Sequence, residues 1–219
     1  MQKNVEKMSI NYSPNFNLRK RRALNIKYLI FHYTGMKSEN EAIKRLTSEQ
    51  SKVSCHYFIK KNGEIIQMVP DLYNAWHAGV SFWKNDNSLN SKSIGIEISN
   101  PGHSNGYTNF SKRQINSIIQ LSKKLIKKYK ISKKNVLGHS DVAPLRKIDP
   151  GEKFPWELFS KKNIAVWHNI NKQKCKSLRN KKVKEEEFYK LLYKFGYHPA
   201  KKQADKIKIF KNFQRRFRP

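Results

Sequence analysis

The 219-residue sequence has little of several features, and each shortage excludes a class of protein. Its two cysteines, Cys55 and Cys175, cannot form the disulfide framework of a small secreted domain and suit a reducing compartment. It has no run of about 18 apolar residues, so the sequence predicts no transmembrane segment. Residues 1–17 are polar and lack the apolar stretch of a secretory signal peptide. These features predict a cytoplasmic location.

Acidic residues are also scarce: 16 Asp and Glu stand against 46 Lys and Arg, which gives a formal net charge of +30. Such a charge attracts any polyanion, including nucleic acid, anionic lipid and acidic wall polymers. However, only 10 of the basic residues are Arg, whose guanidinium fork is favoured for reading phosphates and bases. The excess is spread along the whole chain. We therefore expect a diffuse coat of lysines and no specific nucleic-acid site.

The composition divides the chain into four parts. Hydrophobic residues make up 37% of the sequence, enough for one substantial domain, which we place at residues 25–165. Residues 1–24, which end in a basic run, are predicted to form an irregular basic arm. A polar, lysine-rich linker is expected at 171–184. Residues 185–219 carry apolar residues at helical spacing and are expected to form a small module of two helices.

Within the main domain, three runs rich in β-branched and apolar residues predict strands: 26–34, 93–99 and 136–139. The dipeptide Asn62-Gly63 predicts a hairpin closed by a type I′ turn, which needs positive φ at both central residues. Ser38 with Glu41, and Ser111 with Gln114, are capping pairs that predict two helices. The order strand, helix, hairpin, strand, helix, strand predicts an α/β fold with a mixed central β-sheet flanked by helices.

Polar side chains stand at the ends of two of these strands. His32 lies near the end of the first, and His139 follows the short strand that begins at 136. Asp149 precedes Pro150, which favours an extended backbone, so Lys147 and Asp149 would project to the same side. Two imidazoles and one carboxylate are the ligand set of an open catalytic zinc site, with a fourth position for water. Spacing alone does not separate this reading from coincidence.

Glu97 is a second polar residue inside a predicted strand. It alternates with Ile96 and Ile98 and therefore faces away from the isoleucines. If a helix covers the isoleucines, the Glu97 carboxylate lies on the opposite face, where it needs a salt bridge or a chemical role. The abundance of basic residues leaves both readings open.

Six short blocks then follow one another in a recognisable order: His32–Thr34, Ser54–Ile59 with the Gly63 hairpin, Ala75–Gly79, Ser93–Ile98, Gly138–Pro144 and Arg146–Gly151. Over about residues 26–158, this series resembles the zinc-dependent N-acetylmuramoyl-L-alanine amidases of type 2, a family that includes the peptidoglycan recognition proteins. The resemblance is strongest to the bacterial branch that trims anhydro-muropeptides and peptidoglycan. It implies that the domain at 25–165 is a zinc amidase.

The resemblance implies five site residues: the zinc ligands His32, His139 and Asp149, and the catalytic residues Glu97 and Lys147. It implies hydrolysis of the amide between the lactyl group of N-acetylmuramic acid and L-alanine, in peptidoglycan or in anhydro-muropeptides, during wall degradation and recycling. Cys55 is a departure, because some relatives carry a catalytically helpful tyrosine at that position. Its absence places more of the chemistry on Glu97.

Four further residues are candidates for contact with the substrate: Trp76, His77, Asn100 and Arg146. Trp76 and His77 lie in a long predicted loop, where stacking on a sugar and packing within the loop remain equally open. Arg146 could pair with a carboxylate of the stem peptide or be an ordinary surface charge. Asn100 is expected to border the cleft.

Residues 185–219 resemble a truncated form of the small helical peptidoglycan-binding domain found beside such amidases. The alternative is a pair of helices that braces the main domain. A wall-binding tail would favour the periplasm, the cell envelope or the exterior over the cytoplasm. We expect a monomer that uses Zn²⁺ and binds peptidoglycan or muropeptides. The alternative function is a catalytically inactive basic protein that binds wall polymer or nucleic acid; all five site positions are present, which favours the enzyme.

Overall fold

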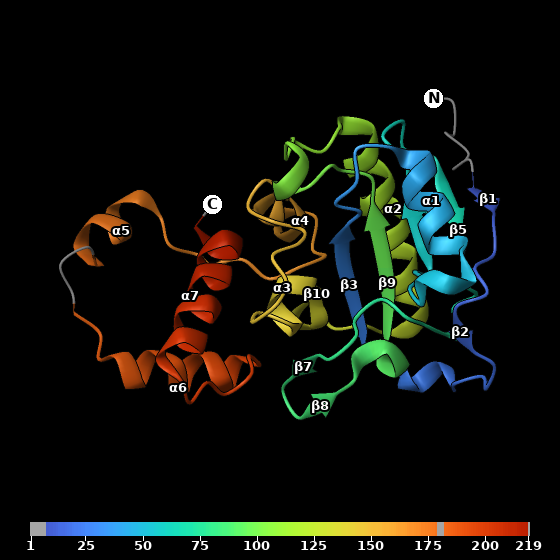
Figure 1. Cartoon of the computed structure of the whole chain (residues 1–219). Coiled ribbons are helices and arrows are strands. Elements are labelled where there is room, and N and C mark those ends of the chain that lie inside the picture. The colour runs from blue at the N-terminus through green and yellow to red at the C-terminus, as the bar shows by residue number, and fades with distance from the viewer. Residues whose placement is uncertain (1–7, 179–181, 219) are drawn as a thin grey trace.

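The computed structural model describes residues 8–178 and 182–218 (Figure 1). Its centre is a six-stranded sheet in the order β1-β5-β4-β9-β3-β10. The strands are β1 (Met8–Ile10), β3 (Tyr28–Tyr33), β4 (Tyr57–Ile59), β5 (Ile65–Gln67), β9 (Ser93–Ile98) and β10 (Val136–Gly138). Only β4 and β5 pair antiparallel, and the other neighbours are parallel. The predicted α/β fold with a mixed sheet is confirmed.

Two further pairs of short strands lie in the connections: β2 (Phe16–Asn17) with β6 (Asn74–Ala75), and β7 (Phe82–Trp83) with β8 (Asp86–Asn87). The α-helices are α1 (Glu39–Thr47), α2 (Lys112–Tyr129), α3 (His139–Val142), α4 (Trp156–Lys161), α5 (Lys172–Leu178), α6 (Glu185–Phe195) and α7 (Gln203–Phe217). The helix α2 begins at the predicted capping box, where Ser111 Oγ accepts from the Gln114 backbone N–H at 3.1 Å. Among the helices of the described ranges, none is long and apolar enough to cross a membrane.

The helices cover both faces of the sheet. On one face, α2 and α4 pack over the isoleucines of β9, as expected from the alternation in that strand. On the other face, α1 packs over the hairpin side of the sheet, while α3, α6 and α7 pack toward β3 and β10. Figure 1 shows α5, α6 and α7 gathered beyond β10, at the opposite side of the molecule from β1. His32 and Glu97 thus project from the face that carries α1 over the hairpin strands and α3, α6 and α7 over β3 and β10.

The C-terminal helices share a core with the main domain. Trp83 is fully buried and meets the ring of Tyr197 edge-on, with 5.1 Å between the ring centroids. A buried charged cluster adds to this contact. The Asp141 carboxylate accepts from the Tyr197 hydroxyl at 2.6 Å and forms an ion pair with Arg216 of α7. We call Asp141, Tyr197 and Arg216 the closed cluster.

The N-terminal segment differs from the irregular arm predicted for residues 1–24. Of its described part, β1 extends the sheet beside β5, and β2 pairs with β6. Arg21, from the basic run, is buried and donates to the backbone carbonyl oxygens of Asp71, Asn90 and Ser93. Arg21 is buried because its guanidinium supplies hydrogen-bond donors to backbone carbonyl oxygens of several loops that point into the protein. Residues 1–7 lie outside the described residues.

Two other local expectations are corrected. The predicted hairpin is present, but its turn is not type I′, because Gly63 has a φ of 87° while Asn62 has none in the positive range. The loop closes instead through a bond from the Gly63 N–H to the Lys60 carbonyl oxygen at 2.9 Å. The predicted linker at 171–184 contains the helix α5. Residues 179–181 of that linker are not among the described residues.

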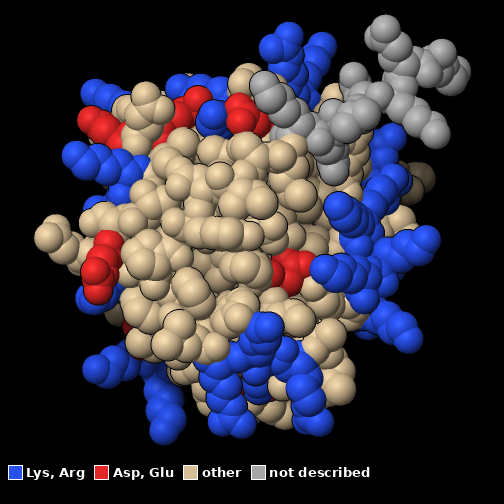
Figure 2. All heavy atoms as spheres, turned by 90° about the vertical axis from the view of Figure 1, so that its right-hand side faces the viewer, with Lys and Arg blue, Asp and Glu red and all other residues tan. Residues whose placement is uncertain are grey.

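The charge distribution agrees with a diffuse coat on the face that Figure 2 shows. There, Lys and Arg side chains lie around the periphery and surround a broad area of uncharged residues.

Candidate metal centre

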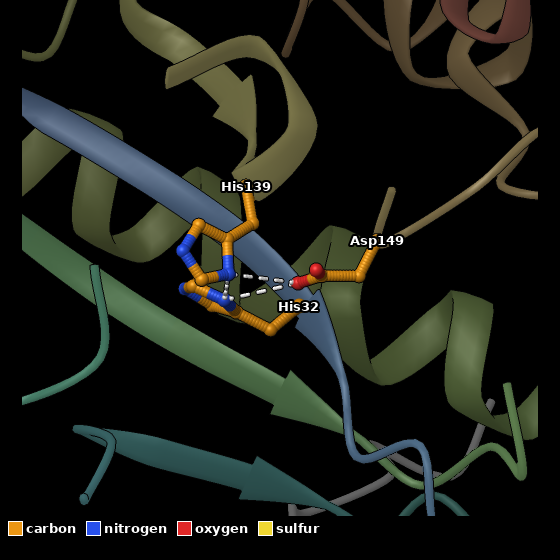
Figure 3. Close-up of side chains that lie close together, drawn as sticks. All are labelled: His32, His139 and Asp149. Carbon is orange, nitrogen blue, oxygen red and sulfur yellow. Dashed lines mark hydrogen bonds and ion pairs between the residues drawn. The ribbon is translucent and has the colours of Figure 1, made fainter. Parts of the chain in front are cut away.

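Three side chains that are far apart in the sequence meet at the carboxyl ends of β3 and β10 (Figure 3). The two strands are parallel, with Gly138 level with Phe31, so His139 follows β10 beside His32 of β3. The Nδ1 atoms of the two histidines lie 2.9 Å apart. Asp149 Oδ2 lies 3.2 Å from Nδ1 of His32 and 3.1 Å from Nδ1 of His139. All three residues are buried.

This triangle of donor atoms suits a zinc ion. Imidazole nitrogen and carboxylate oxygen are zinc ligands, and tetrahedral ligands bound at about 2.0–2.1 Å stand about 3.3 Å from one another. The sides of the triangle, 2.9 to 3.2 Å, are close to that separation. Burial and the neighbouring His139 lower the pKa of His32 to about 4, so its imidazole is neutral at pH 7, as a metal ligand must be.

Asp149 supplies the charge of the triangle. Burial alone would raise its pKa, but its contacts with His139 and His32 hold the pKa well below its usual range. Asp149 is therefore an ionised carboxylate inside the protein. An ionised oxygen beside two neutral nitrogens leaves a divalent cation with one net positive charge, which keeps the cation an effective Lewis acid.

Glu97 lies beside this triangle because of strand register. β3 and β9 pair His32 directly with Glu97, so both side chains project from the same face of the sheet. Glu97 Oε2 is buried and has no hydrogen-bond partner among the described residues. Burial, with a smaller contribution from Asp149, raises the pKa of Glu97 to about 8, while Lys147 opposes the shift. A carboxyl group with this pKa gains and loses protons close to neutral pH, as a general acid–base group must.

A cavity of about 420 Å³ opens onto these groups. Glu97, His139, Lys147 and Asp149 line it, so Lys147 and Asp149 do project to the same space. The helix α1 contributes Arg45 to the lining of the cavity. The volume falls in the range of small-molecule sites, which is about 300–1,000 Å³.

The four candidate substrate contacts are placed differently from one another. Trp76 and Arg146 line the cavity. The indole N–H of Trp76 donates to Asn17 Oδ1 at 2.8 Å, and Arg146 donates to the carbonyl oxygens of Ala78 and Val80. Both side chains are thus at the cavity and already bonded within the protein.

His77 and Asn100 are held more deeply. His77 lines the cavity, but its Nδ1 lies 3.0 Å from His32 Nε2 and its Nε2 lies 3.1 Å from Ser93 Oγ, so both ring nitrogens are occupied. Asn100 is buried and is not among the residues that line the cavity. Its side chain bonds the backbone of Gly102 and Thr108, which fixes the loop after β9.

Cys55 takes no part in the centre. The thiol is fully buried against Met68, and burial raises its pKa well above the usual value. It does not line the cavity. A neutral thiol in an apolar cluster cannot replace a tyrosine hydroxyl.

Sequence reasoning missed Asn90 and Ser93, which hold the residues around the centre. Asn90 Oδ1 accepts from the backbone N–H groups of His77 and Ala78, at 3.1 and 2.7 Å. Ser93 bonds His77. One signal was available, because Ser93, Gly95 and Glu97 alternate with the isoleucines and share the face that carries the centre.

Comparison with known proteins agrees with this geometry. The family described as N-acetylmuramoyl-L-alanine amidase (Amidase_2) matches residues 22–152. The N-acetylmuramoyl-L-alanine amidase AmiD of Escherichia coli is 34% identical over 211 residues, covering 89% of this chain and 75% of the relative. The 1,6-anhydro-N-acetylmuramyl-L-alanine amidase AmpD of Haemophilus influenzae is 40% identical over 111 residues, covering 50% of this chain and 58% of that relative.

Two solved structures are similar over most of the chain. AmiD from E. coli, in complex with the substrate anhydro-N-acetylmuramic acid-L-Ala-D-γ-Glu-L-Lys, matches with a TM-score of 0.78 and 34% identity, covering 89% of this chain and 81% of that one. AmpDH3 from Pseudomonas aeruginosa, in complex with anhydromuramic pentapeptide, matches with a TM-score of 0.81 and 29% identity, covering 92% of this chain and 86% of that one.

Proposed function

Because this chain belongs to the N-acetylmuramoyl-L-alanine amidase family, we propose that it hydrolyses the amide between the lactyl group of N-acetylmuramic acid and L-alanine, using a zinc ion held by His32, His139 and Asp149. One observation carries the assignment of residues. The buried donor triangle lies beside Glu97, whose buried oxygen has no partner among the described residues. That combination offers a metal position and a proton acceptor in one cavity.

The residues of the cavity divide the chemistry between them. A zinc ion bound at the triangle supplies Lewis acidity, which lowers the pKa of water from about 15.7 toward about 7. Glu97 accepts the proton of the attacking water at its carboxylate and donates it to the nitrogen of the departing L-alanine as the C–N bond breaks. The ammonium group of Lys147 stabilises the negative charge that develops on the carbonyl oxygen.

We propose anhydro-muropeptides as the substrate class. The AmiD and AmpDH3 structures that cover about nine-tenths of this chain hold anhydromuramic peptides. Arg45, Arg146 and Lys147 line the cavity and give it a positive charge that suits the carboxylates of a stem peptide. These cations support binding of a small acidic peptide in addition to a sugar.

The test is to incubate the purified chain with anhydro-N-acetylmuramic acid-L-Ala-D-γ-Glu-L-Lys and to identify the products by mass. We expect free anhydro-N-acetylmuramic acid and a peptide that begins with L-alanine. A zinc chelator should abolish the reaction, and added Zn²⁺ should restore it. Intact substrate in the presence of zinc-loaded protein would contradict the proposal and favour an inactive binding protein.

We further propose that α6 and α7 brace the main domain and do not fold as an independent binding module. The support is the shared core, in which Leu192, Tyr197 and Ile209 pack with Ile30 and Leu137 of the sheet. The full chain should therefore unfold on heating in one calorimetric transition. Two separate transitions would contradict a brace and favour an independent peptidoglycan-binding-like module.

For the compartment we propose the cytoplasm. Cys55 is a free, buried thiol, which is compatible with a reducing environment. Fractionation of cells that produce the tagged full chain tests this proposal directly. Recovery in the periplasmic or envelope fraction would contradict it.

A further inference from the structure

Two consecutive residues in the loop between β6 and β7 contact the far side of both histidines of the metal centre. His77 Nδ1 lies 3.0 Å from His32 Nε2, and the Ala78 carbonyl oxygen lies 3.2 Å from His139 Nε2. The donor triangle uses the other nitrogen, Nδ1, of each ring. We propose that His77 and Ala78 are positioning residues that fix the tautomer of both histidines, so that each Nδ1 offers a lone pair to the metal. The inference rests on the proposed zinc site.

The direction of the hydrogen bonds on the His32 side follows from a chain of donors. The Ser93 hydroxyl donates its one proton to the Leu89 carbonyl oxygen at 2.7 Å, and a carbonyl oxygen can only accept. Ser93 Oγ is therefore the acceptor for His77 Nε2–H at 3.1 Å. A neutral imidazole has one ring proton, so His77 Nδ1 is bare and accepts from His32 Nε2–H. The ring proton of His32 is thus on Nε2, and its Nδ1 is free to bind a cation.

The His139 side is simpler because its partner is a backbone carbonyl. The Ala78 oxygen can only accept, so His139 Nε2 is its donor, and a His139 ring with a single proton then leaves Nδ1 bare for the metal. Arg146 lies 3.4 Å from the same His139 nitrogen, but its terminal nitrogen already donates at shorter distance to the carbonyl oxygens of Ala78 and Val80. Arg146 therefore fixes the loop that carries Ala78, and the Ala78 carbonyl oxygen in turn orients the His139 ring.

Two further residues, Asn90 and Gly95, fix the position of the loop that carries His77 and Ala78. The side-chain oxygen of Asn90 accepts from the backbone N–H groups of His77 and Ala78. Gly95 of β9 leaves room for the His77 ring, since a Cβ at that position would lie 2.4 Å from His77 Cγ. These contacts hold His77 and Ala78 in place, and so fix the hydrogen-bond partners of His32 and His139. They are made by residues of the Ala75–Gly79 block, Asn90, Ser93 and Gly95.

Fixing the tautomer matters because an imidazole with its proton on Nδ1 cannot bind a metal through that atom. The partners of metal-bound histidines orient the ring and raise its basicity, and their loss commonly weakens metal affinity by about 10–100-fold. His77→Leu removes the acceptor for His32 while keeping an apolar side chain in the space. We expect it to weaken zinc affinity by this factor, as measured by competition with a chromophoric chelator.

Three variants separate this role from a structural one. His77→Gln keeps an amide oxygen that can accept from His32, and should restore most of the affinity. Ser93→Ala removes only the acceptor for His77 Nε2–H and should give a smaller loss than His77→Leu. His198→Leu, at an exposed histidine outside the network, is the matched control and should bind zinc as the wild type does.

The decisive measurement uses metal-free protein and does not depend on turnover. The ¹⁵N shifts of labelled histidine side chains distinguish the two tautomers. Because Asp149 can accept a proton from either Nδ1, the quantity compared is the share of the Nε2–H tautomer in the wild type and in the variant. His77→Leu should lower this share at His32 and leave it unchanged at His139. An unchanged Nε2–H share at His32, or unchanged zinc affinity, in His77→Leu would overturn the inference. A protein with the expected tautomers and zinc affinity that cleaves no muropeptide would contradict the proposed function alone.

Discussion

The short helix α3 contributes residues to two buried polar clusters, one whose ligand atoms converge on a point and one whose carboxylate is bonded to donors. At its first residue, His139 joins His32 and Asp149 in a triangle whose ligand atoms converge on one point. Two residues later, Asp141 belongs to the closed cluster, where its carboxylate accepts from the Tyr197 hydroxyl, the Gly138 N–H and Arg216. Both carboxylates are almost fully buried.

The difference lies in what each carboxylate contacts. In the closed cluster, both oxygens of Asp141 are bonded to donors, and these bonds attach α7 to α3. In the triangle, the Nδ1 atoms of two histidines and an oxygen of Asp149 face one another, and Glu97 Oε2 nearby has no partner within the described residues. A buried polar group without a partner costs about 1–3 kcal/mol, and Arg216 Nε of the closed cluster is another such group among the described residues. The convergence of three ligand atoms on one point is therefore what marks the triangle as a site for a ligand. The closed cluster attaches α7 to the main domain, and the open cluster of His32, His139 and Asp149 has the ligand set of a metal site.

The largest effect should come from breaking the open cluster. His139→Ala removes one of three ligands, and we expect the purified variant to bind no stoichiometric zinc and to release no product from anhydro-muropeptide. Metal content by mass spectrometry and product analysis check this. Urea unfolding of the metal-free forms is the control. A His139→Ala variant that keeps one zinc per chain would remove His139 from the ligand set.

Glu97→Gln tests the acid–base group without changing its size. The amide cannot accept the proton of water, so we expect kcat to fall by about 10²- to 10⁴-fold while zinc content stays at the wild-type value. The two quantities are measured on the same preparation. Loss of zinc from this variant would make Glu97 a ligand, and unchanged kcat would exclude it as the general base.

Arg216→Met should have the opposite profile, because it breaks the closed cluster. Removing one partner of a buried ion pair leaves the other uncompensated, and we expect a loss of about 3–5 kcal/mol in the free energy of unfolding. Zinc affinity of the folded protein should not change. Lys208→Met, at an exposed position of the same helix, is the matched control and should stay within about 0.5 kcal/mol of the wild type. An equal effect of both substitutions in urea unfolding would show that the Asp141–Arg216 pair does not hold α7.

The smallest expected effect is on the pH dependence of stability, and it concerns Asp71, a second buried carboxylate that accepts several hydrogen bonds. Burial alone would raise its pKa, but bonds from Lys128, Tyr129 and Tyr57 lower the pKa below its usual value. The unfolded chain therefore takes up this proton at a higher pH than the folded one. The stability that Asp71 contributes is complete above about pH 4 and is lost as the pH falls through the folded-state pKa.

Asp71→Asn removes this titration. Between about pH 5 and pH 2, the free energy of unfolding of the variant should fall less steeply than that of the wild type. Urea unfolding of both proteins across this range provides the comparison. Parallel curves would mean that Asp71 has the same pKa in the folded and unfolded chain.

The sequence predicted the parts of this fold that depend on local pattern. The alternation of isoleucines placed Glu97 on the face opposite α2, and the pair Ser111 and Gln114 marked the start of that helix. The order of elements was sufficient for the α/β class with a mixed sheet, but not for the edge strand β1, which lies in the predicted irregular arm. The triangle needed more. The strand ends offered His32, His139 and Asp149 only as one possible ligand set, and the resemblance to a family selected it. The parallel pairing of β3 with β10 brings the two histidines together.

What the sequence could not predict depends on long-range contacts. Arg21 looked like part of a charged arm, although its guanidinium is buried among carbonyl groups from three later segments. The turn at Gly63 depends on which backbone groups pair across the hairpin, and the dipeptide alone does not determine that. Ser93 and Asn90 carry no recognisable motif, because their importance comes from the loop that folds against them.

The register between β3 and β9 has a consequence for how such an enzyme diversifies. His32 and Glu97 are neighbours across a single pair of strands, whose spacing of about 4.7–4.9 Å is set by backbone hydrogen bonds. The separation of the proposed proton acceptor Glu97 from the proposed metal ligand His32 is therefore set by the strand spacing, which substitutions of side chains change little. The walls of the cavity come from α1 and from loops, and these can accumulate substitutions that alter which peptides enter. Selectivity is free to drift while the hydrolytic geometry stays constant.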